Sequence, residues 1–450
     1  MQARLSLVDS SIKSMHQTLF YEAIHRDRHS RYFYLWTLVS TRKFPYWLPR
    51  PKVHSLKIYL FPLKMEIIEE ESMSPDQLAV NQRFLEACRA LDIEQIQKLV
   101  RDEGADAWFQ EPETGKGPLH LVVEGAHVAE AEEKDAAVEK ADECLSWLMG
   151  NGAVWNQMDR EYRTPACRAR EYGLAKLYAN CIDAGVRAEL LLAHLNRKQQ
   201  TSAGARNEAY LNSKLTWTEP TDGAKTLLDD ENNGVMMSWE KDIMKRSAEV
   251  LVPTPGEGSV LNIGFGLGIV DTYLQERRPK RHVIVEAHPD VIAEMKAQGW
   301  DKKPGVEIVE GRWQDVAGQL AEQEVFDSVY YDAFGEYYED LREFFDEAVG
   351  LLSPDGILSF FHGLGADNQT FYDVYTKLVM LELYDFGLDT EWEELYIDMP
   401  DEEWEGTKRR YWALETASSV SHSIFKFVHQ LSKDSALTKL LLAKPTPSEA

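Results

Sequence analysis

The sequence predicts an α/β protein in which a doubly wound parallel sheet follows a smaller all-helical region. Beyond about residue 210, apolar stretches of four to six residues alternate with amphipathic helical segments, and this alternation is typical of a parallel sheet with helices on both faces. A glycine-rich turn directly follows an apolar strand at residues 259–263. Residues 75–192 carry a different pattern, in which a helix–turn–helix layout is repeated.

Length and composition indicate a globular protein of two domains. The chain has 450 residues, more than a single hydrophobic core usually holds. Hydrophobic residues make up 44% and charged residues 28%, and no apolar run reaches the roughly 18 residues that cross a bilayer. We therefore expect no membrane association.

The charge and the cysteines restrict the partners and the compartment. A formal charge of −26 disfavours nucleic acid and suits a cationic protein partner, although such acidity can also serve solubility alone. The four cysteines form no CxxC pair, and no HExxH motif is present. We expect no metal site and a reducing compartment, the cytoplasm or the nucleus.

Residues 1–72 differ from the rest of the chain. The first 65 carry a net charge of +8, whereas the remainder carries −34. A basic, aromatic stretch without periodicity is compatible with a mitochondrial-type presequence. We favour the alternative, a poorly ordered N-terminal extension.

Residues 73–192 form the predicted helical domain. GPLHLVV (117–123) and TPACRAR (164–170) hold equivalent places in two similar segments. Both resemble ankyrin repeats, whose T-P-L-H signature begins the first helix of each unit. Pro118 and Pro165 should therefore lie in first helical turns, and His120 should brace a turn by hydrogen bonding.

After a polar connector (193–210), residues 211–416 form the predicted α/β domain. Its expected strands are SVLNI, HVIVE, VEIVE, FDSVYY and GILSFF, with helices such as DVIAEMKAQGW and EDLREFFDEAVGLL between them. The last two strands, near ELYIDM and RRYWALE, should pair antiparallel at the end of the sheet. We interpret 417–450 as a divergent tail in which SIFKFVHQL could form an amphipathic helix.

The glycine turn of residues 264–268 predicts a nucleotide-like ligand. Gly264, Gly266 and Gly268 would let the backbone approach a ligand closely. A dinucleotide site requires G-x-G-x-x-G, and the third glycine here comes one residue early. S-adenosylmethionine carries no phosphate and also needs an acid for its ribose hydroxyls. Glu286, at the end of the second strand, suits either ligand, so the turn alone leaves both open, as well as a turn without any ligand.

Five segments occur in one order: GVMMSWEKDIM, VLNIGFGLGI, VIVEAHPDV, EGRWQDV and FDSVYYDAF. Together they resemble the guanidino-group methyltransferases, most closely the fungal protein arginine N5-methyltransferase family, which is related to guanidinoacetate methyltransferase. The resemblance spans about residues 75–415. It implies a Rossmann-like class I methyltransferase sheet, ankyrin-like repeats before it, and S-adenosylmethionine as the cofactor.

The resemblance also implies roles for individual residues. Glu240 and Asp332 would face the substrate guanidinium, for which carboxylates are the natural bidentate partners. Asp332 would also accept a proton. Glu286 would bind the ribose hydroxyls, and Asp332 would also border the cofactor. The other residues expected around the cofactor are Tyr210, Met236, Met244, Gly264, Phe265, Gly266, Leu267, Gly268, Ile269, Val270, Ala287, His288, Trp313 and Gln314.

The predicted function is methylation of the δ (N5) nitrogen of an arginine in a protein, performed by a monomer in the cytoplasm and nucleus. The substrate protein should be basic, and the family resemblance suggests a ribosomal-type protein. Three alternatives remain: a methyltransferase for a small guanidino metabolite, a non-enzymatic ankyrin-based binding protein, and an NAD oxidoreductase. The acidic charge and the helical domain disfavour a small-metabolite methyltransferase. The pair Glu240 and Asp332 disfavours a non-enzymatic binding protein, and the glycine spacing disfavours an NAD oxidoreductase.

Overall fold

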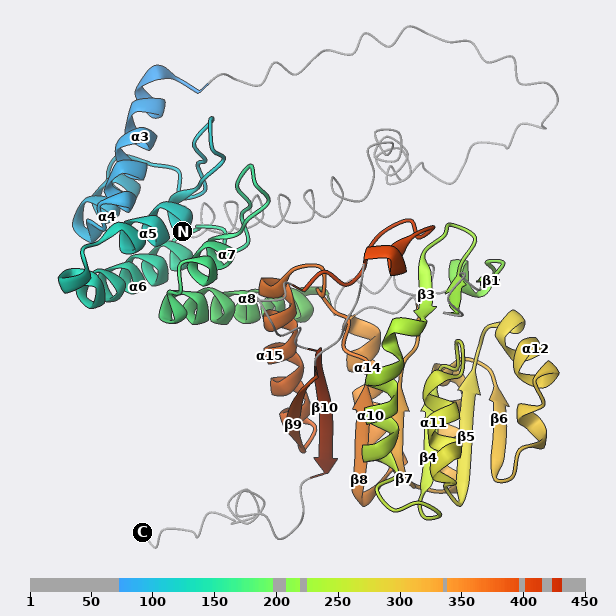
Figure 1. Cartoon of the computed structure of the whole chain (residues 1–450). Helices are drawn as coiled ribbons and strands as arrows, with labels where there is room; N and C mark the ends of the chain where they lie inside the picture. The colour runs from blue at the N-terminus through green and yellow to red at the C-terminus, as the bar shows by residue number, and fades with distance from the viewer. Residues whose placement is uncertain are drawn as a thin grey trace, which may run out of the picture. The chain divides into compact units, whose positions relative to one another are not determined.

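The structure is a computed structural model (Figure 1), which describes residues 73–196, 208–218, 225–334, 338–395, 401–414 and 423–430. The predicted N-terminal extension (1–72) and much of the connector and of the tail lie outside these residues. Contacts divide the chain into two compact units, Met1–Cys181 and Ile182–Ala450. Each unit is described by itself.

The first unit is helical throughout its described part. Its elements are α3 (Pro75–Arg89), α4 (Ile93–Arg101), α5 (Pro118–Val128), η2 (Ala131–Glu133), α6 (Lys134–Gly150) and α7 (Pro165–Glu171), and α8 (Ala175–Asn196) crosses the unit boundary. α8 therefore extends into the predicted connector. The core includes Phe84, Ile96, Leu121 and Leu145, which are fully buried.

The repeated motifs begin helices, as predicted. Pro118 and Pro165 are the first residues of α5 and α7, where a missing backbone N–H costs no helical hydrogen bond. The buried His120 accepts a hydrogen bond from the Gly117 N–H at Nδ1 (3.1 Å), and its Nε2 lies 2.9 Å from the Arg163 carbonyl oxygen. The predicted bracing role of His120 is confirmed, whereas the ankyrin assignment stays a prediction.

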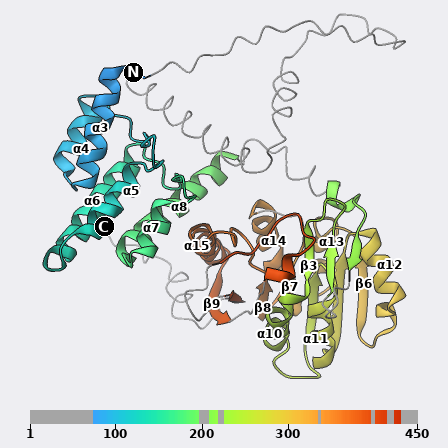
Figure 2. The same cartoon turned by 45° about the horizontal axis from the view of Figure 1, so that its top comes forward.

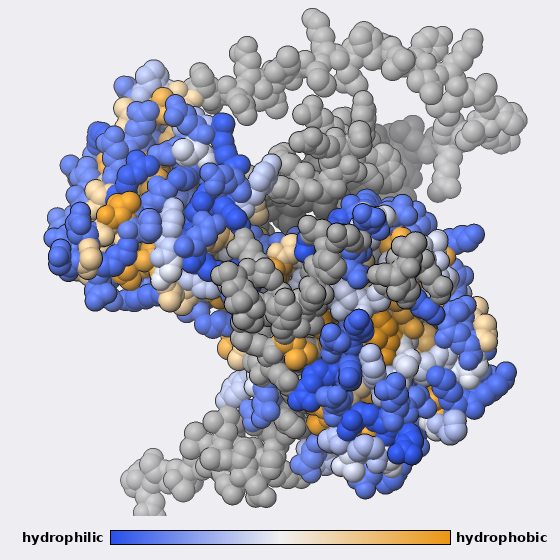
Figure 3. Space-filling view, viewed as in Figure 1, coloured by the Kyte–Doolittle hydropathy of each residue, from blue (hydrophilic) through white to orange (hydrophobic). Residues whose placement is uncertain are grey.

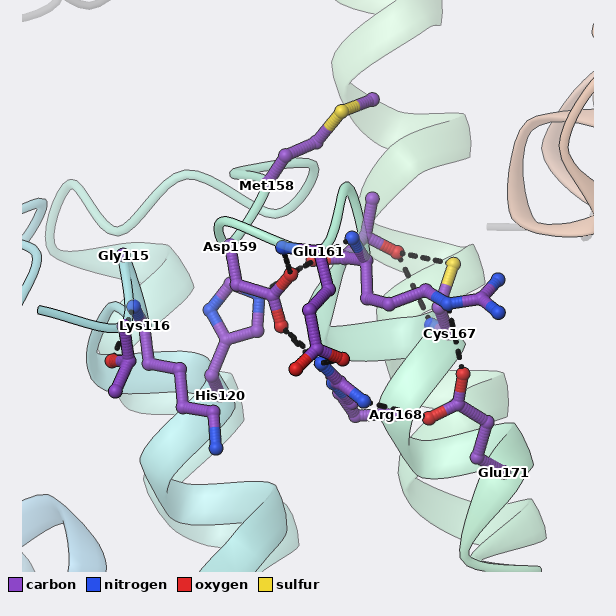
Figure 4. Close-up of polar contacts among 12 residues, drawn as sticks. Gly115, Lys116, His120, Met158, Asp159, Glu161, Cys167, Arg168 and Glu171 are labelled. Atoms are coloured by element: carbon purple, nitrogen blue, oxygen red, sulfur yellow. Dashed lines mark hydrogen bonds and ion pairs between the residues drawn. The ribbon is translucent and has the colours of Figure 1, made fainter.

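A buried ion pair fixes the loop before α7 (Figure 4). The Asp159 carboxylate accepts hydrogen bonds from Arg168 Nη2 (2.7 Å) and Nε (3.0 Å) and from the backbone N–H groups of Glu161 and Arg163. Burial acts to raise the pKa of Asp159, but these hydrogen bonds outweigh it and hold that pKa below its usual value. The loop geometry thus depends on a charged pair in which Asp159 is almost fully buried.

The second unit is built on a seven-stranded sheet of order β6-β5-β4-β7-β8-β10-β9. Its strands are β4 (Ser259–Ile263), β5 (Arg281–Glu286), β6 (Val306–Glu310), β7 (Phe326–Tyr331), β8 (Leu352–Phe360), β9 (Leu388–Leu395) and β10 (Ser423–Gln430). The first five pair in parallel, and β10 is antiparallel to both β8 and β9. The predicted parallel sheet is confirmed.

Helices cover both faces of this sheet. α10 (Lys241–Leu251), α11 (Ile269–Arg277) and α12 (Pro289–Ala297) alternate along the chain with the early strands, whereas α13 (Trp313–Gln323), α14 (Tyr338–Leu351) and α15 (Gln369–Asp385) come later. Figure 2 shows α10 and α11 on one face and α13, α14 and α15 on the other. Because both faces are covered, all residues of β4 and β5 except the first of each strand are buried.

A small antiparallel sheet precedes α10. It consists of β1 (Thr216–Thr218), β2 (Thr226–Leu228) and β3 (Gly234–Met237), with β2 in the middle. β3 leads directly into the 3-10 turn η3 (Ser238–Glu240) and then into α10. This continuity places Glu240 at the start of a helix, without a side-chain cap bond to that helix.

The end of the sheet differs from the prediction in three ways. The sixth strand, β9, lies at 388–395, mostly before the expected ELYIDM segment. RRYWALE is not a strand, because residues 409–414 are irregular. SIFKFVHQ forms β10 instead of a helix, so the sheet extends beyond the predicted domain end at residue 416. The apolar residues of this segment lie at 424, 425, 427, 428 and 431, a spacing typical of a helix, but over so short a segment β-branched and aromatic residues also fit a strand, which explains the wrong assignment.

The surface drawn in Figure 3 is mostly hydrophilic, with hydrophobic residues in smaller groups. Among the described helices, none has the length and apolar composition needed to cross a bilayer.

Candidate active site

A cavity lies at the carboxyl ends of β4, β5 and β7. This edge is where ligands of doubly wound sheets bind. The cavity is lined by the glycine turn, the ends of the three strands, the start of α13 and part of the segment before β1. The lining residues are Tyr210, Leu211, Val235, Met236, Ile263, Gly264, Phe265, Gly266, Val285, Glu286, Ala287, Gly311, Arg312, Trp313, Gln314, Asp332, Ala333 and Phe334.

Gly264 brings the glycine turn and Asp332 together. Its φ is +92°, and a Cβ at this position would lie 2.2 Å from the Asp332 carbonyl oxygen. Only glycine allows this conformation and this close approach. The Asp332 N–H also donates to the Ile263 carbonyl oxygen (2.9 Å), which holds the end of β7 beside the end of β4.

Glu286 organises the other side of the turn. Its Oε2 accepts a hydrogen bond from the Phe265 N–H (2.8 Å), and its Oε1 accepts from the N–H groups of Ala287 and His288 (both 2.7 Å). Burial raises the pKa of this carboxyl, and the backbone N–H groups oppose that rise. Glu286 lines the cavity, so a ligand hydroxyl there can share its carboxylate oxygens with the backbone N–H groups.

Aromatic and sulfur-containing side chains form the remaining walls. Trp313 packs edge-on against Phe344 (ring centroids 5.2 Å apart) and is nearly buried. The Tyr210 ring contacts Phe334 (4.8 Å). Met236 lies under the turn, where its sulfur is 3.1 Å from the Leu267 nitrogen. The cavity therefore has flat apolar surfaces beside one organised carboxylate, a combination that suits an adenosine group.

The structure separates the predicted cofactor residues into two groups. Ten line the cavity: Tyr210, Met236, Gly264, Phe265, Gly266, Glu286, Ala287, Trp313, Gln314 and Asp332. The others do not, and these are Met244, Leu267, Gly268, Ile269, Val270 and His288. Met244 and Val270 belong to the core behind the turn, and His288 is buried at the N-cap of α12. The direct cofactor contacts of this second group stay predictions.

The two predicted catalytic carboxylates come together in the structure. Glu240 is 4% exposed, and its pKa is raised well above the usual value by burial and then by the charge of Asp332. Burial, followed by the charge of Asp271, raises the pKa of Asp332 to about 7. Asp332 Oδ2 is buried and has no hydrogen-bond partner among the described residues. Among the described residues no cation pairs with either acid, so the two carboxyls form a site that suits a cationic ligand.

Tyr411, which the sequence analysis did not select, contacts this pair. Its hydroxyl donates a hydrogen bond to Glu240 Oε1. The ring lies in an aromatic cluster whose other members are Trp239, Phe361, Tyr372, Trp404 and Trp412. The adjacent aromatic residues Tyr411 and Trp412 in RRYWALE were a sequence signal for this contact. The segment was instead interpreted as a strand, so the role of Tyr411 was not predicted.

The fold and the site define the class of the protein. A parallel sheet with one antiparallel strand beside its far edge, a glycine turn after the strand β4 and an acid at the end of the next strand are features of the class I S-adenosylmethionine-dependent methyltransferases. Comparison with known proteins specifies the family. The chain belongs to the protein arginine N-methyltransferase 2 family.

Three relatives with that name illustrate the similarity. The one from Aspergillus fumigatus is 41% identical over 403 residues, covering 74% of this chain and 94% of its own. The one from Aspergillus oryzae is 40% identical over 395 residues, with the same coverage. The one from Saccharomyces cerevisiae is 36% identical over 336 residues, covering 65% of this chain and 80% of its own. Residues 209–381 also match the guanidinoacetate N-methyltransferase family.

Solved structures are similar only at a distance. Spermidine synthase from Thermotoga maritima aligns with 49% of this chain and 68% of its own, at 16% identity and a TM-score of 0.33. The N-methyltransferase NodS from Bradyrhizobium japonicum aligns with 43% of this chain and 97% of its own, at 15% identity and a TM-score of 0.29.

The predicted membership of an arginine methyltransferase family is confirmed at this level, and S-adenosylmethionine is the cofactor of this methyltransferase. The cavity residues fit that group. The Glu286 carboxylate lines the cavity as an acceptor for ribose hydroxyls, Trp313 and Gln314 border a space for the base, and the turn allows a close backbone contact.

Proposed function

We propose that this protein methylates the δ (N5) nitrogen of an arginine residue in a protein substrate. The observation that carries the proposal is a pair of carboxylates: Glu240 is buried, and the half-buried Asp332 lines the cofactor cavity with a buried Oδ2 that has no hydrogen-bond partner among the described residues. Membership of the protein arginine N-methyltransferase 2 family supports arginine as the acceptor.

The acidic pair suits a guanidinium in charge and in shape. A guanidinium is planar and cationic, and its N–H groups match carboxylates bidentately. It is also a poor nucleophile, because its lone pairs are delocalised. Carboxylates at the terminal nitrogens would draw the positive charge toward them and leave the δ-nitrogen lone pair more available for attack.

Asp332 is the proton acceptor in this proposal. The δ-nitrogen forms a bond to the methyl carbon while the bond between that carbon and the sulfonium sulfur breaks, and the proton lost from the nitrogen passes to Asp332. A carboxyl whose pKa is about 7 is well matched to this exchange near neutral pH. S-adenosylmethionine supplies the activated methyl group. The walls of the cavity align the reacting atoms and exclude water.

The helical unit supports a macromolecular substrate. Its repeated helix pairs begin at Gly117–Pro118 and Thr164–Pro165, which resemble ankyrin repeats, and such repeats present extended docking surfaces. The formal charge of −26 favours a basic protein, for example of ribosomal type. We place the activity in the cytoplasm and nucleus and assign it to a monomer, as the sequence suggested.

One observation favours a second substrate class. Residues 209–381 match the guanidinoacetate N-methyltransferase family, so a small guanidino acid is the alternative acceptor. That acceptor needs no docking unit, which is why a protein arginine is the first choice.

The test uses purified protein, S-adenosylmethionine with a labelled methyl group, and a cell extract depleted of its own arginine methylation. The labelled protein is hydrolysed and the methylarginine isomer identified, with guanidinoacetate as a parallel acceptor. Glu240→Gln and Asp332→Asn remove one charge each. Asp242→Asn is the matched control, because Asp242 is an exposed acid two residues after Glu240.

We expect δ-methylarginine from the wild type and the control, and a loss of at least about 100-fold in each site variant. A terminal-nitrogen isomer would refute the N5 assignment. Label found only in guanidinoacetate would establish the metabolite alternative instead.

A further inference from the structure

We propose that Tyr411 is a positioning residue for Glu240: its hydroxyl orients the carboxylate and favours its ionised form, so that the acidic pair can receive a guanidinium. The inference rests on the proposed arginine methylation, which it deepens. It assigns a role to a segment that follows the sixth strand and is distant in sequence from the cofactor turn.

Several contacts fix the position of Tyr411. Its segment is tied down on both sides, because the Lys408 N–H donates to the Asn232 carbonyl oxygen and the Ala413 N–H to that of Ala366 (both 2.7 Å). The next residue, Trp412, is 4% exposed. The hydroxyl is therefore presented by an anchored backbone.

The ring of Tyr411 is also enclosed. Its centroid lies 4.8 Å from that of Trp404 and 5.9 Å from that of Trp239. Gly234 makes room for it on β3, since a Cβ there would lie 3.0 Å from Tyr411 Cε1. Trp239 and Glu240 are adjacent in η3, so the cluster that holds the ring also holds the backbone of its hydrogen-bond partner.

The charge balance at Glu240 gives the hydroxyl its function. Burial and the charge of Asp332 both raise the pKa of Glu240, whereas the hydrogen bond from Tyr411 and one from the Met237 backbone lower it. A hydrogen bond to a charged acceptor is about twice as strong as one between neutral groups. Among the described residues, the other ionisable groups that interact with Glu240 or Asp332 are Tyr210, Asp271 and Tyr330, and none of them carries a positive charge.

This balance predicts that substrate binding depends on pH. Without a guanidinium, two close, buried acids resist double ionisation, so the pair keeps a proton near neutral pH. When the cationic side chain enters, both acids can ionise, and the proton is released. Affinity for the substrate then rises with pH through the neutral range, and Tyr411 lowers the pH at which this rise occurs.

The test compares Tyr411→Phe with the wild type and with Tyr331→Phe. Tyr331 is a matched control because it is 4% exposed, stacks on Phe344 and has a hydroxyl without a hydrogen-bond partner among the described residues. KM and kcat are measured from pH 6 to 9 with the acceptor protein purified from the extract in its unmethylated form. S-adenosylhomocysteine binding reports on the cofactor site.

For Tyr411→Phe we expect KM to rise about tenfold at pH 7 and its pH profile to move about one unit to the alkaline side. The kcat at high pH and S-adenosylhomocysteine affinity should stay within about threefold of wild type. Tyr331→Phe should leave the KM profile unchanged. If the pH dependence of KM in Tyr411→Phe is also the same as in the wild type, Tyr411 contributes packing alone and the inference is wrong.

A second measurement needs no substrate. The Glu240 carboxyl is followed by ¹³C NMR during a pH titration, with Glu240→Gln identifying its signal. We expect a pKa about one unit higher in Tyr411→Phe than in the wild type. Equal Glu240 pKa values in the two proteins would overturn the role of Tyr411. Because this measurement does not depend on arginine methylation, it distinguishes failure of the inference from failure of the proposed function.

Discussion

Replacing Glu286 by glutamine tests how the cofactor site is organised. The Glu286 carboxylate accepts hydrogen bonds from three backbone N–H groups, one on Oε2 and two on Oε1. A glutamine can place its carbonyl oxygen at Oε1 and keep two of them. Its NH₂ group then faces the Phe265 N–H, so two donors oppose each other in a buried place.

The expected magnitude follows from that geometry. One hydrogen bond to a charged acceptor is lost and one buried N–H is left unpaired, each worth about 1–3 kcal/mol. The ribose hydroxyls also lose a charged acceptor. The two backbone terms are lost in the free and the bound protein alike, so the change in Kd comes mainly from the lost ribose acceptor, about 1.5–3 kcal/mol; we expect the Kd for S-adenosylhomocysteine to rise about 10- to 150-fold, because each 1.4 kcal/mol is a factor of ten.

The assay is isothermal titration calorimetry with S-adenosylhomocysteine at pH 7.5, combined with thermal unfolding of each variant. Glu310→Gln is the matched control. Glu310 pairs with Glu286 in the β5–β6 register, but its side chain is 51% exposed and bonds Lys296. The control should bind like the wild type. A folded Glu286→Gln protein with a Kd within twofold of wild type would refute this view of the site.

Three further predictions concern stability. Gly264→Ala should lower the thermal midpoint by at least about 6 °C, because its Cβ would overlap the Asp332 carbonyl oxygen, whereas Gly318→Ala, a helical position with open space, should raise it slightly. Ionisation of Asp332 should destabilise the folded protein as pH rises from about 4 to about 7, because the pKa of Asp332 is raised in the folded state. Urea unfolding measured at pH 5 and pH 7.5 should therefore show a smaller loss of stability with pH in the Asp332→Asn variant than in the wild type. An equal loss in both proteins would contradict this prediction. Arg168→Leu should cost the helical unit about 2–4 kcal/mol in urea unfolding, because Asp159 is left buried without its cation, and a loss below about 0.5 kcal/mol would show that the pair is not needed.

Much of the second unit could be predicted from its sequence. SVLNI and VEIVE coincide with β4 and β6, and the glycine turn lies where the pattern placed it. The reason is physical: the central strand β4 is covered on both faces and is mostly apolar and buried, the edge strand β6 keeps exposed glutamates, and a backbone approach as close as that of Gly264 to Asp332 admits no side chain. Such local requirements are visible in the residues themselves.

The sequence alone did not reveal the contacts between distant segments. Glu240 and Tyr411 are 171 positions apart and meet only because Lys408 and Ala413 are tied to the turn before β3 and to the segment after β8. β10 was missed because the apolar residues of SIFKFVHQL follow a helical spacing, although its β-branched and aromatic residues also suit a strand. The separation of Met244 from the cavity depends on which face of α10 turns inward, and that face is set by packing.

The most direct test of the central claim is a crystal structure with S-adenosylhomocysteine and an arginine-containing peptide from the acceptor protein. We predict that the guanidinium lies between Glu240 and Asp332, with its terminal nitrogens on the carboxylates and its δ-nitrogen toward the cofactor sulfur, about 3–4 Å from the position of the transferred methyl. A guanidinium bound away from the two carboxylates, or one that turns a terminal nitrogen toward the sulfur, would contradict it.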